Sequence, residues 1–154
     1  MRRLLPAIAA LGLILALAAP AFASDRIPTG VKKVDVTLTF PPTAGGSKKT
    51  VRRTMTKAAT LQKLVDAVDV LRTAKTVAVC PMFIRLSPVL TVVFEGSSGQ
   101  TLAETRVQVE QGSHGTSGSS FCFPIQFTAG SANQRLVGNS YVRLVGRLIG
   151  TPIS

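Results

Sequence analysis

The chain has 154 residues, and its 18 lysines and arginines outnumber 7 aspartates and glutamates to give a formal charge of +11. This length fits one compact domain and excludes most multidomain enzymes. Hydrophobic residues make up 45% of the chain and about 40% of residues 24–154, which is enough for a core and argues against wholesale disorder.

Residues 1–23 have the pattern of a secretory signal peptide. Arg2 and Arg3 precede an uncharged, mostly apolar stretch, and Ala21 and Ala23 supply the small residues that a signal peptidase requires. The stretch is shorter than the roughly 20 residues that span a bilayer, although an uncleaved anchor is the alternative. We therefore expect cleavage near Ala23, a secreted protein of the medium or cell envelope, and no stable membrane span in the mature chain. Its charge falls from +11 to +9 because two arginines are removed.

The next part of the chain predicts two strands and a helix. Residues 34–40 alternate apolar and polar side chains, as a half-buried strand does, and residues 49–55 can return beside it after a turn rich in Pro and Gly. Residues 57–72 place Leu and Val at helical spacing and predict an amphipathic helix. Thr54 or Thr56 is expected to cap its N-terminus.

Strand patterns dominate the second half. Pro81 and Pro88 argue against a long regular element over 73–88, and Pro124 indicates an edge strand or a bulge. A loop rich in Gly and Ser, expected to be mobile, covers 111–120. The predicted strands are 89–95, 101–110, 121–127 and 141–149.

These elements predict an α+β fold, in which one amphipathic helix packs on an antiparallel sheet of about five or six strands. A short segment, 24–30, precedes a single domain over 31–154. We expect the fold to contain one disulfide, because Cys80 and Cys122 are the only cysteines and an oxidising compartment lets them pair. Two separate buried thiols are the alternative.

The order of these features resembles a group of small exported actinobacterial proteins. Cys80-Pro81 is followed by an apolar strand that ends in Phe94, a turn with Gly99, and a second cysteine, Cys122. The resemblance covers about residues 31–127. Proteins of that group generally have no assigned activity, so the resemblance implies an exported two-cysteine α+β domain and no particular chemistry. The loop 111–120 and the C-terminal strand depart from the pattern.

Catalytic and metal-binding patterns are weak. His114 is the only histidine, and it sits among Gly and Ser residues that leave nothing to fix a catalytic base. One histidine and two paired cysteines are too few ligands for a zinc site. Asp66 and Asp69 lie near each other on the solvent face of the predicted helix, and nothing in the sequence suggests the cleft that paired catalytic carboxylates need. We therefore expect no catalytic residues, no cofactor and no enzyme activity.

The charge distribution is more informative. Five cations fall within ten residues at the second strand and the helix start, with no acid among them, and two more precede the strand that would pair with this one. The positive electrostatic field of such a cluster attracts anionic cell-envelope polymers or acidic proteins, and salt weakens this attraction. A solubilising face is the alternative, and nucleic-acid binding is disfavoured because no aromatic platform accompanies the cations. The candidate anion-binding residues are Lys32, Lys33, Lys48, Lys49, Arg52, Arg53 and Lys57.

A second hypothesis comes from Cys80-Pro81-Met82-Phe83. This segment is similar to the reactive loop of the Streptomyces subtilisin inhibitor family, in which a cysteine, a proline and a residue such as Met precede the scissile bond. The resemblance implies that Met82 is the specificity residue and that Phe83 follows the bond, with an extracellular protease as partner. A rigid loop binds tightly because its ordering cost is already met. This chain lacks cysteines for the second disulfide that the family carries.

Overall fold

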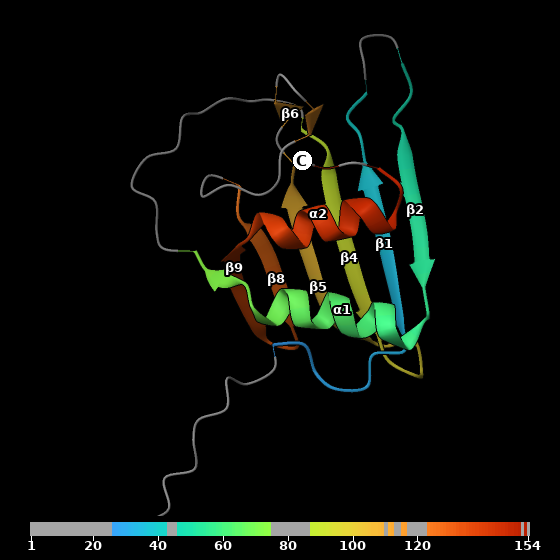
Figure 1. Ribbon diagram of the computed structural model, residues 1–154, viewed down its shortest axis with the longest axis vertical. Coiled ribbons are helices and arrows are strands. Elements are labelled where there is room, and N and C mark those ends of the chain that lie inside the picture. The colour runs from blue at the N-terminus through green and yellow to red at the C-terminus, as the bar shows by residue number, and fades with distance from the viewer. Residues whose placement is uncertain are drawn as a thin grey trace, which may run out of the picture.

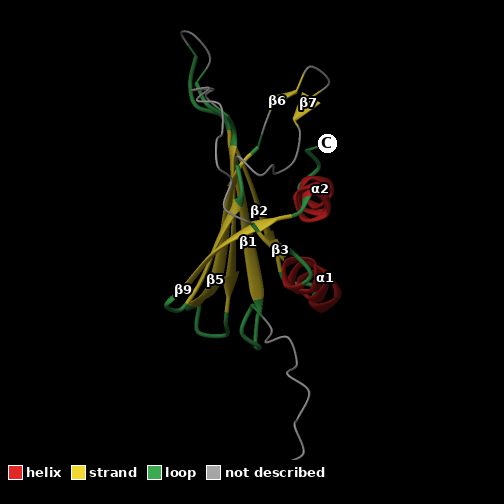
Figure 2. Ribbon diagram, turned by 90° about the vertical axis from the view of Figure 1, so that its left-hand side faces the viewer, coloured by secondary structure: helices red, strands yellow, loops and turns green. Residues whose placement is uncertain are grey.

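The computed structural model describes residues 26–42, 46–74, 87–109, 111–112, 115–116, 123–151 and 153. In these residues, a seven-stranded antiparallel sheet carries two helices on one face (Figures 1 and 2). The elements in chain order are β1 (Lys33–Thr39), β2 (Thr50–Met55), α1 (Ala58–Asp69), β3 (Arg72–Thr73), β4 (Val89–Glu95), β5 (Thr101–Gln108), β6 (Gln111–Gly112), β7 (Gly115–Thr116), β8 (Ile125–Ala129), β9 (Ala132–Val137) and α2 (Asn139–Leu148). The predicted α+β class and antiparallel sheet are confirmed. The predicted count of about five or six strands and one helix is too low, because the sheet also contains β3 and β9 and a second helix packs on it.

The sheet has the order β2-β1-β4-β5-β8-β9-β3, and β6 and β7 form a separate two-stranded ribbon. The ribbon lies within the loop predicted to be mobile. Alternation along the strands places one set of side chains under the helices and the other on the opposite face, which no described element covers (Figure 2). We call this second face the uncovered face. Val36 of β1 lies opposite Val92 of β4 on the helix side, and both are buried.

Helix α1 confirms the predicted amphipathic helix, since Leu61, Leu64 and Val68 are buried against the sheet. The predicted cap is wrong. The N-cap residue is Lys57, which makes no side-chain capping hydrogen bond. Its carbonyl instead accepts hydrogen bonds from the backbone N–H groups of Thr60 and Leu61.

Arg26 closes the other end of α1. Its guanidinium donates to the carbonyl oxygens of Val68, Asp69 and Leu71 at 3.1, 2.8 and 2.5 Å. The backbone N–H of Arg26 donates to the Asp69 carboxylate at 3.0 Å. Because the last carbonyls of a helix have no partners within it, these contacts satisfy them and fasten the N-terminal segment to α1.

The C-terminal strand predicted at 141–149 is wrong, because this segment forms α2. Tyr141, Val142 and Val145 are buried at helical spacing against the sheet. Tyr141 is fully buried, and its hydroxyl forms a 2.7 Å hydrogen bond with that of Thr105 on β5. This pair joins α2 to the middle of the sheet. Neither helix in the described part of the chain has the length and apolar character needed to cross a bilayer.

The strand predicted at 121–127 begins later, at Ile125, and an unpredicted strand, β9, follows it. Pro124 does not mark an edge or a bulge, since β8 lies between β5 and β9. The proline precedes the strand, so its missing N–H interrupts no pairing. Ile125 and Phe127 are buried. Residues 121–122 and 75–86, with both cysteines and the predicted disulfide, lie outside the described residues.

Candidate anion-binding surface

Strand β2 places two arginines on opposite sides of the sheet edge. Arg52 lies opposite Thr37 on the uncovered face, and Arg53 lies opposite Val36 on the helix side. Successive residues of a strand point to opposite faces, so neighbouring arginines in sequence cover both sides of the edge. Both side chains are exposed.

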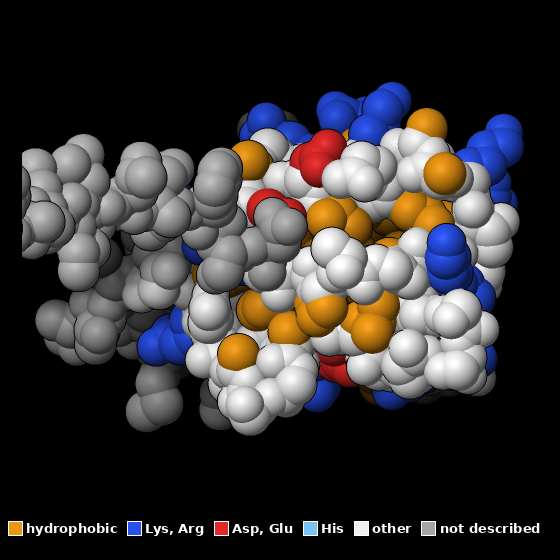
Figure 3. All heavy atoms as spheres, turned by 90° about the horizontal axis from the view of Figure 1, so that it is seen from below, with side chains coloured by type: hydrophobic (Ala, Val, Ile, Leu, Met, Phe, Trp, Pro, Cys, Tyr) orange, Lys and Arg blue, Asp and Glu red, His pale blue; other side chains and the backbone are white. Residues whose placement is uncertain are grey.

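Three lysines extend this line at both ends of β2. Lys48 and Lys49 precede the strand, Lys57 follows it at the start of α1, and all three are exposed. The Lys49 ammonium lies 5.9 Å from the centre of the Phe40 ring. Seen from below, Lys and Arg side chains lie at several places around the margin, including the right-hand side, on which β2 lies in Figure 1 (Figure 3). We call Lys48, Lys49, Arg52, Arg53 and Lys57 the β2 cluster.

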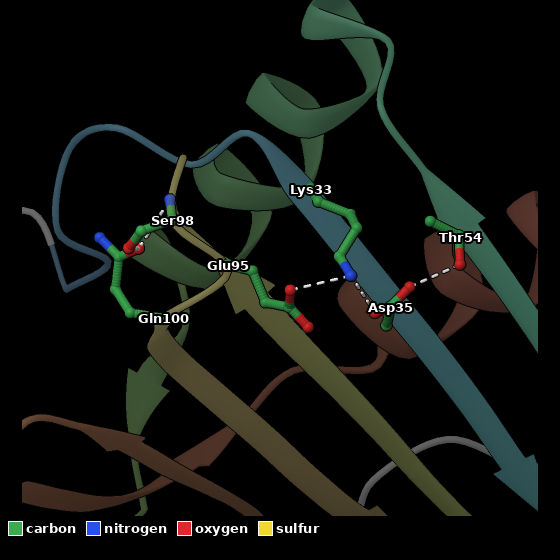
Figure 4. A network of polar contacts seen from close by, with 6 residues as sticks. All are labelled: Lys33, Asp35, Thr54, Glu95, Ser98 and Gln100. Carbon is green, nitrogen blue, oxygen red and sulfur yellow. Dashed lines mark hydrogen bonds and ion pairs between the residues drawn. The ribbon is translucent and has the colours of Figure 1, made fainter.

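The structure separates Lys33 from this cluster. The Lys33 ammonium forms ion pairs with Asp35 at 3.0 Å and with Glu95 at 2.9 Å (Figure 4). The hydrogen bonds to Glu95 and then to Asp35 raise the pKa of Lys33. Two carboxylates therefore compensate this lysine, and it contributes little to an anion-binding field.

Asp35 is the acid on the strand beside β2, and it is also engaged. The Thr54 hydroxyl donates to the Asp35 carboxylate at 2.5 Å (Figure 4). This hydrogen bond, followed by the contacts with Lys33, lowers the pKa of Asp35. Within the described residues the only ion pairs are those of Lys33, so the five cations of the β2 cluster have no acidic partner there.

Lys32 is the remaining predicted residue, and it lies at the far end of the cluster. Its side chain is exposed, and its backbone N–H donates to the carbonyl of Glu95 at 2.8 Å. Together with Thr56 it borders a hollow of about 530 Å³ between the N-terminal segment and α1, whose apolar lining is visible in Figure 3. Leu61 and Val65 contribute to that lining.

The structure adds two arginines that the sequence did not connect to the cluster. The strand registers form one cross-strand row on the uncovered face. The row runs Arg52, Thr37, Thr91, Arg106, Gln126 and Arg135. Arg106 lies in the predicted strand 101–110, but Arg135 belongs to β9, for which no strand was predicted.

The weaker site candidates are placed as follows. Asp69 accepts hydrogen bonds from the N-terminal backbone, and Asp66 accepts one from the Gln62 amide at 2.7 Å, so the structure gives both carboxylates structural partners. No group of three His, Cys, Asp or Glu side chains in the described ranges gathers to hold a metal ion. The residues that lie outside those ranges are Cys80, Met82, Phe83, His114 and Cys122.

No protein-family model matches this chain, and no curated protein or solved structure shows significant similarity to it.

Proposed function

We propose that the protein is a secreted, non-enzymatic binding protein that holds anionic partners on the β2 cluster. Cell-envelope polymers and acidic proteins are the partners that fit this chemistry outside a cell. One observation carries the proposal: five exposed cations follow one sheet edge with no acidic partner among the described residues, while Lys33 nearby is compensated by two acids. The line from Lys48 to Lys57 extends over roughly 30 Å at strand spacing.

The position of Lys57 supports a role in binding. The N-terminal end of a helix carries partial positive charge and favours acids, each worth about 0.3–1 kcal/mol. Helix α1 has no acid in its first turn, and Lys57 stands at its N-cap without a capping side chain. This arrangement costs the isolated protein stability, and a bound anion would offset the cost.

Charge on an edge strand also has a simpler use, because lysines and arginines there discourage pairing between copies of a protein. Edge protection alone requires only a few charges along the strand. The cluster continues past both ends of β2, at Lys48, Lys49 and Lys57, beyond what protection of a six-residue edge strand needs. This continuation favours binding.

Retention on immobilised dextran sulfate tests the proposal. The variant Arg52→Glu/Arg53→Glu is expected to elute at much lower salt than the wild type, because binding through several cations depends steeply on salt. Arg143→Glu/Arg147→Glu is the matched control, since it changes net charge equally on exposed residues of α2. Equal losses in the two variants would show that only net charge matters and would refute the site.

We also propose a second candidate, inhibition of a subtilisin-like protease by the segment that contains Met82 and Phe83. The contacts at both ends of residues 75–86 favour it. The Ala74 N–H donates to the Arg135 carbonyl at 2.7 Å, and the Pro88 carbonyl accepts a hydrogen bond from the Val109 N–H at 2.8 Å. A loop with fixed ends loses less conformational entropy when it binds.

This second candidate predicts a stoichiometric complex with subtilisin that is abolished by Met82→Pro. The Arg52→Glu/Arg53→Glu variant should inhibit as well as the wild type, because β2 lies at the sheet edge opposite β3, which precedes the segment. Absence of inhibition at micromolar protein would dismiss this function and leave anion binding untouched.

A further inference from the structure

We propose that the β2 edge binds its anionic partner as an added β-strand, so that the partner is an extended acidic segment of another protein. This inference rests on the proposed function and specifies its ligand. Strand addition uses main-chain hydrogen bonds for affinity and side-chain positions for selectivity.

Alternate residues of β2 direct their backbone hydrogen-bonding groups toward β1 and away from it. The Phe40 N–H donates to the Lys49 carbonyl at 2.8 Å, so Lys49 directs its backbone toward β1. Bonded and non-bonded positions alternate in an antiparallel ladder. Thr50, Arg52 and Thr54 therefore direct their backbone N–H and C=O groups away from β1. All three residues are exposed, and no described strand lies beyond β2.

The opposite edge of the sheet is too short to accept a guest strand. It is formed by β3, which has only the two residues Arg72–Thr73. Strand β2 has six residues and stands free at the right of Figure 1. In the described sheet, β2 is therefore the edge long enough to accept a guest strand.

Charge selects the kind of guest. A second copy of β2 added antiparallel would bring Arg52 and Arg53 close to the same cations of its partner, and like charges across strands are destabilising. An acidic guest places a carboxylate beside Arg52 on the uncovered face and another beside Arg53 on the helix side. Further acids would meet Lys48 and Lys49 beyond the start of β2.

The register also predicts the guest's pattern. Val51 and Met55 turn toward the helix side and are half-buried and buried, so apolar guest residues suit the positions opposite them. Thr50 and Thr54 suit threonines, which pair well across strands. An antiparallel guest matching residues 55 back to 48 therefore reads Val-Thr-Glu-Glu-Val-Thr-Glu-Glu.

This octapeptide and a proline control form the test. Replacing both threonines by proline keeps the charge but removes the two N–H groups that would donate to the carbonyls of Thr54 and Thr50. We expect the wild-type protein to bind the threonine peptide about tenfold more tightly than the proline peptide, as loss of two net hydrogen bonds implies. Equal affinity for the two peptides would overturn strand addition.

A protein variant tests the same contact from the other side. Thr50→Pro removes an outward N–H, leaves the charge unchanged and does not interrupt pairing with β1. The lost N–H would donate to a carbonyl of the guest, so Thr50→Pro should bind the threonine peptide about fivefold more weakly, as loss of one net hydrogen bond implies, while retention on dextran sulfate stays as in the wild type. Unchanged affinity of Thr50→Pro for the threonine peptide would overturn the inference. Thr50→Val, which keeps the N–H, is the control for the side chain.

Hydrogen exchange provides a direct readout. The amides of Thr50, Arg52 and Thr54 should become protected when the threonine peptide binds and stay unprotected with dextran sulfate. Loss of dextran sulfate binding in Arg52→Glu/Arg53→Glu without any peptide-induced protection in the wild type would overturn strand addition and keep the proposed function. Unchanged dextran sulfate binding in that variant would overturn both.

Discussion

Tyr141 is the only tyrosine in a chain without tryptophan, so its ionisation can be followed by absorbance without interference. The side chain is fully buried between α2 and the sheet, and burial raises the pKa of Tyr141 above its ordinary value, against a smaller opposing effect of the hydrogen bond with Thr105. We therefore predict that raising the pH ionises this tyrosine only when the protein unfolds.

The size of the effect follows from linkage between proton binding and folding. Because the folded-state pKa lies above the unfolded value near 10, the stabilising contribution is complete below pH 10 and is lost as the pH rises further. Each pH unit above 10 costs about 1.4 kcal/mol of unfolding free energy. Between pH 9 and pH 11, the wild type should lose about 1.4 kcal/mol more than Tyr141→Phe, which has no proton to release.

Urea unfolding at both pH values measures this difference, and tyrosinate absorbance should rise together with loss of circular dichroism. Ionisation of other groups affects both proteins equally, so comparison with Tyr141→Phe removes its effect. Tyrosinate absorbance that develops near pH 10 while the protein stays folded would refute the buried placement of Tyr141 and the packing of α2.

Three other predictions concern single contacts within the fold. Gly146→Ala should lower the unfolding free energy by about 1–2 kcal/mol despite alanine's better helix propensity, because a Cβ there lies 2.8 Å from the carbonyl oxygen of Thr151; thermal unfolding checks the sign. Arg26→Ala should cost about 1.5 kcal/mol through loss of charged hydrogen bonds to the end of α1, measured in urea, with faster amide exchange in the last turn of that helix. Asp35 has a lowered pKa, so its contribution is present above its ordinary pKa near 3.8 and is lost as the pH falls below it. Thr54→Val removes the main cause, and it should therefore lose less stability in acid than the wild type; an equal loss would contradict the assignment.

The strands and helix with one clear period were predictable from the sequence. Residues 34–40 alternate apolar and polar side chains and fall on β1, the apolar run 89–95 forms β4 with those bounds, and α1 shows its apolar stripe. The segment 141–149 fits both periods, because Arg143 and Arg147 stand at even spacing and also one helical turn apart. Tyr141 and Val142 are adjacent and both buried, which fits one face of a helix better than a half-buried strand. Only the tertiary structure shows this burial.

The sequence predicted which cations make up the candidate site, but not how they and their neighbours are arranged in space. The run of cations from Lys48 to Lys57 is visible in the sequence, and the structure places all of them in exposed positions. The sequence could not show that Glu95 pairs with Lys33, since that contact depends on β4 lying beside β1. Arg135 joined the row on the uncovered face only because β9 pairs with β8.

The most direct test of the central claim is to map where an anionic polymer contacts the protein. Isotope-labelled protein is titrated with dextran sulfate, and the amide chemical shifts of all exposed Lys and Arg residues are followed in the same experiment. We predict that the largest changes fall on residues 48–57 and disappear as salt is added. Changes concentrated instead at Arg143 and Arg147 on α2, or spread evenly over all exposed cations, would contradict the assignment of binding to the β2 cluster.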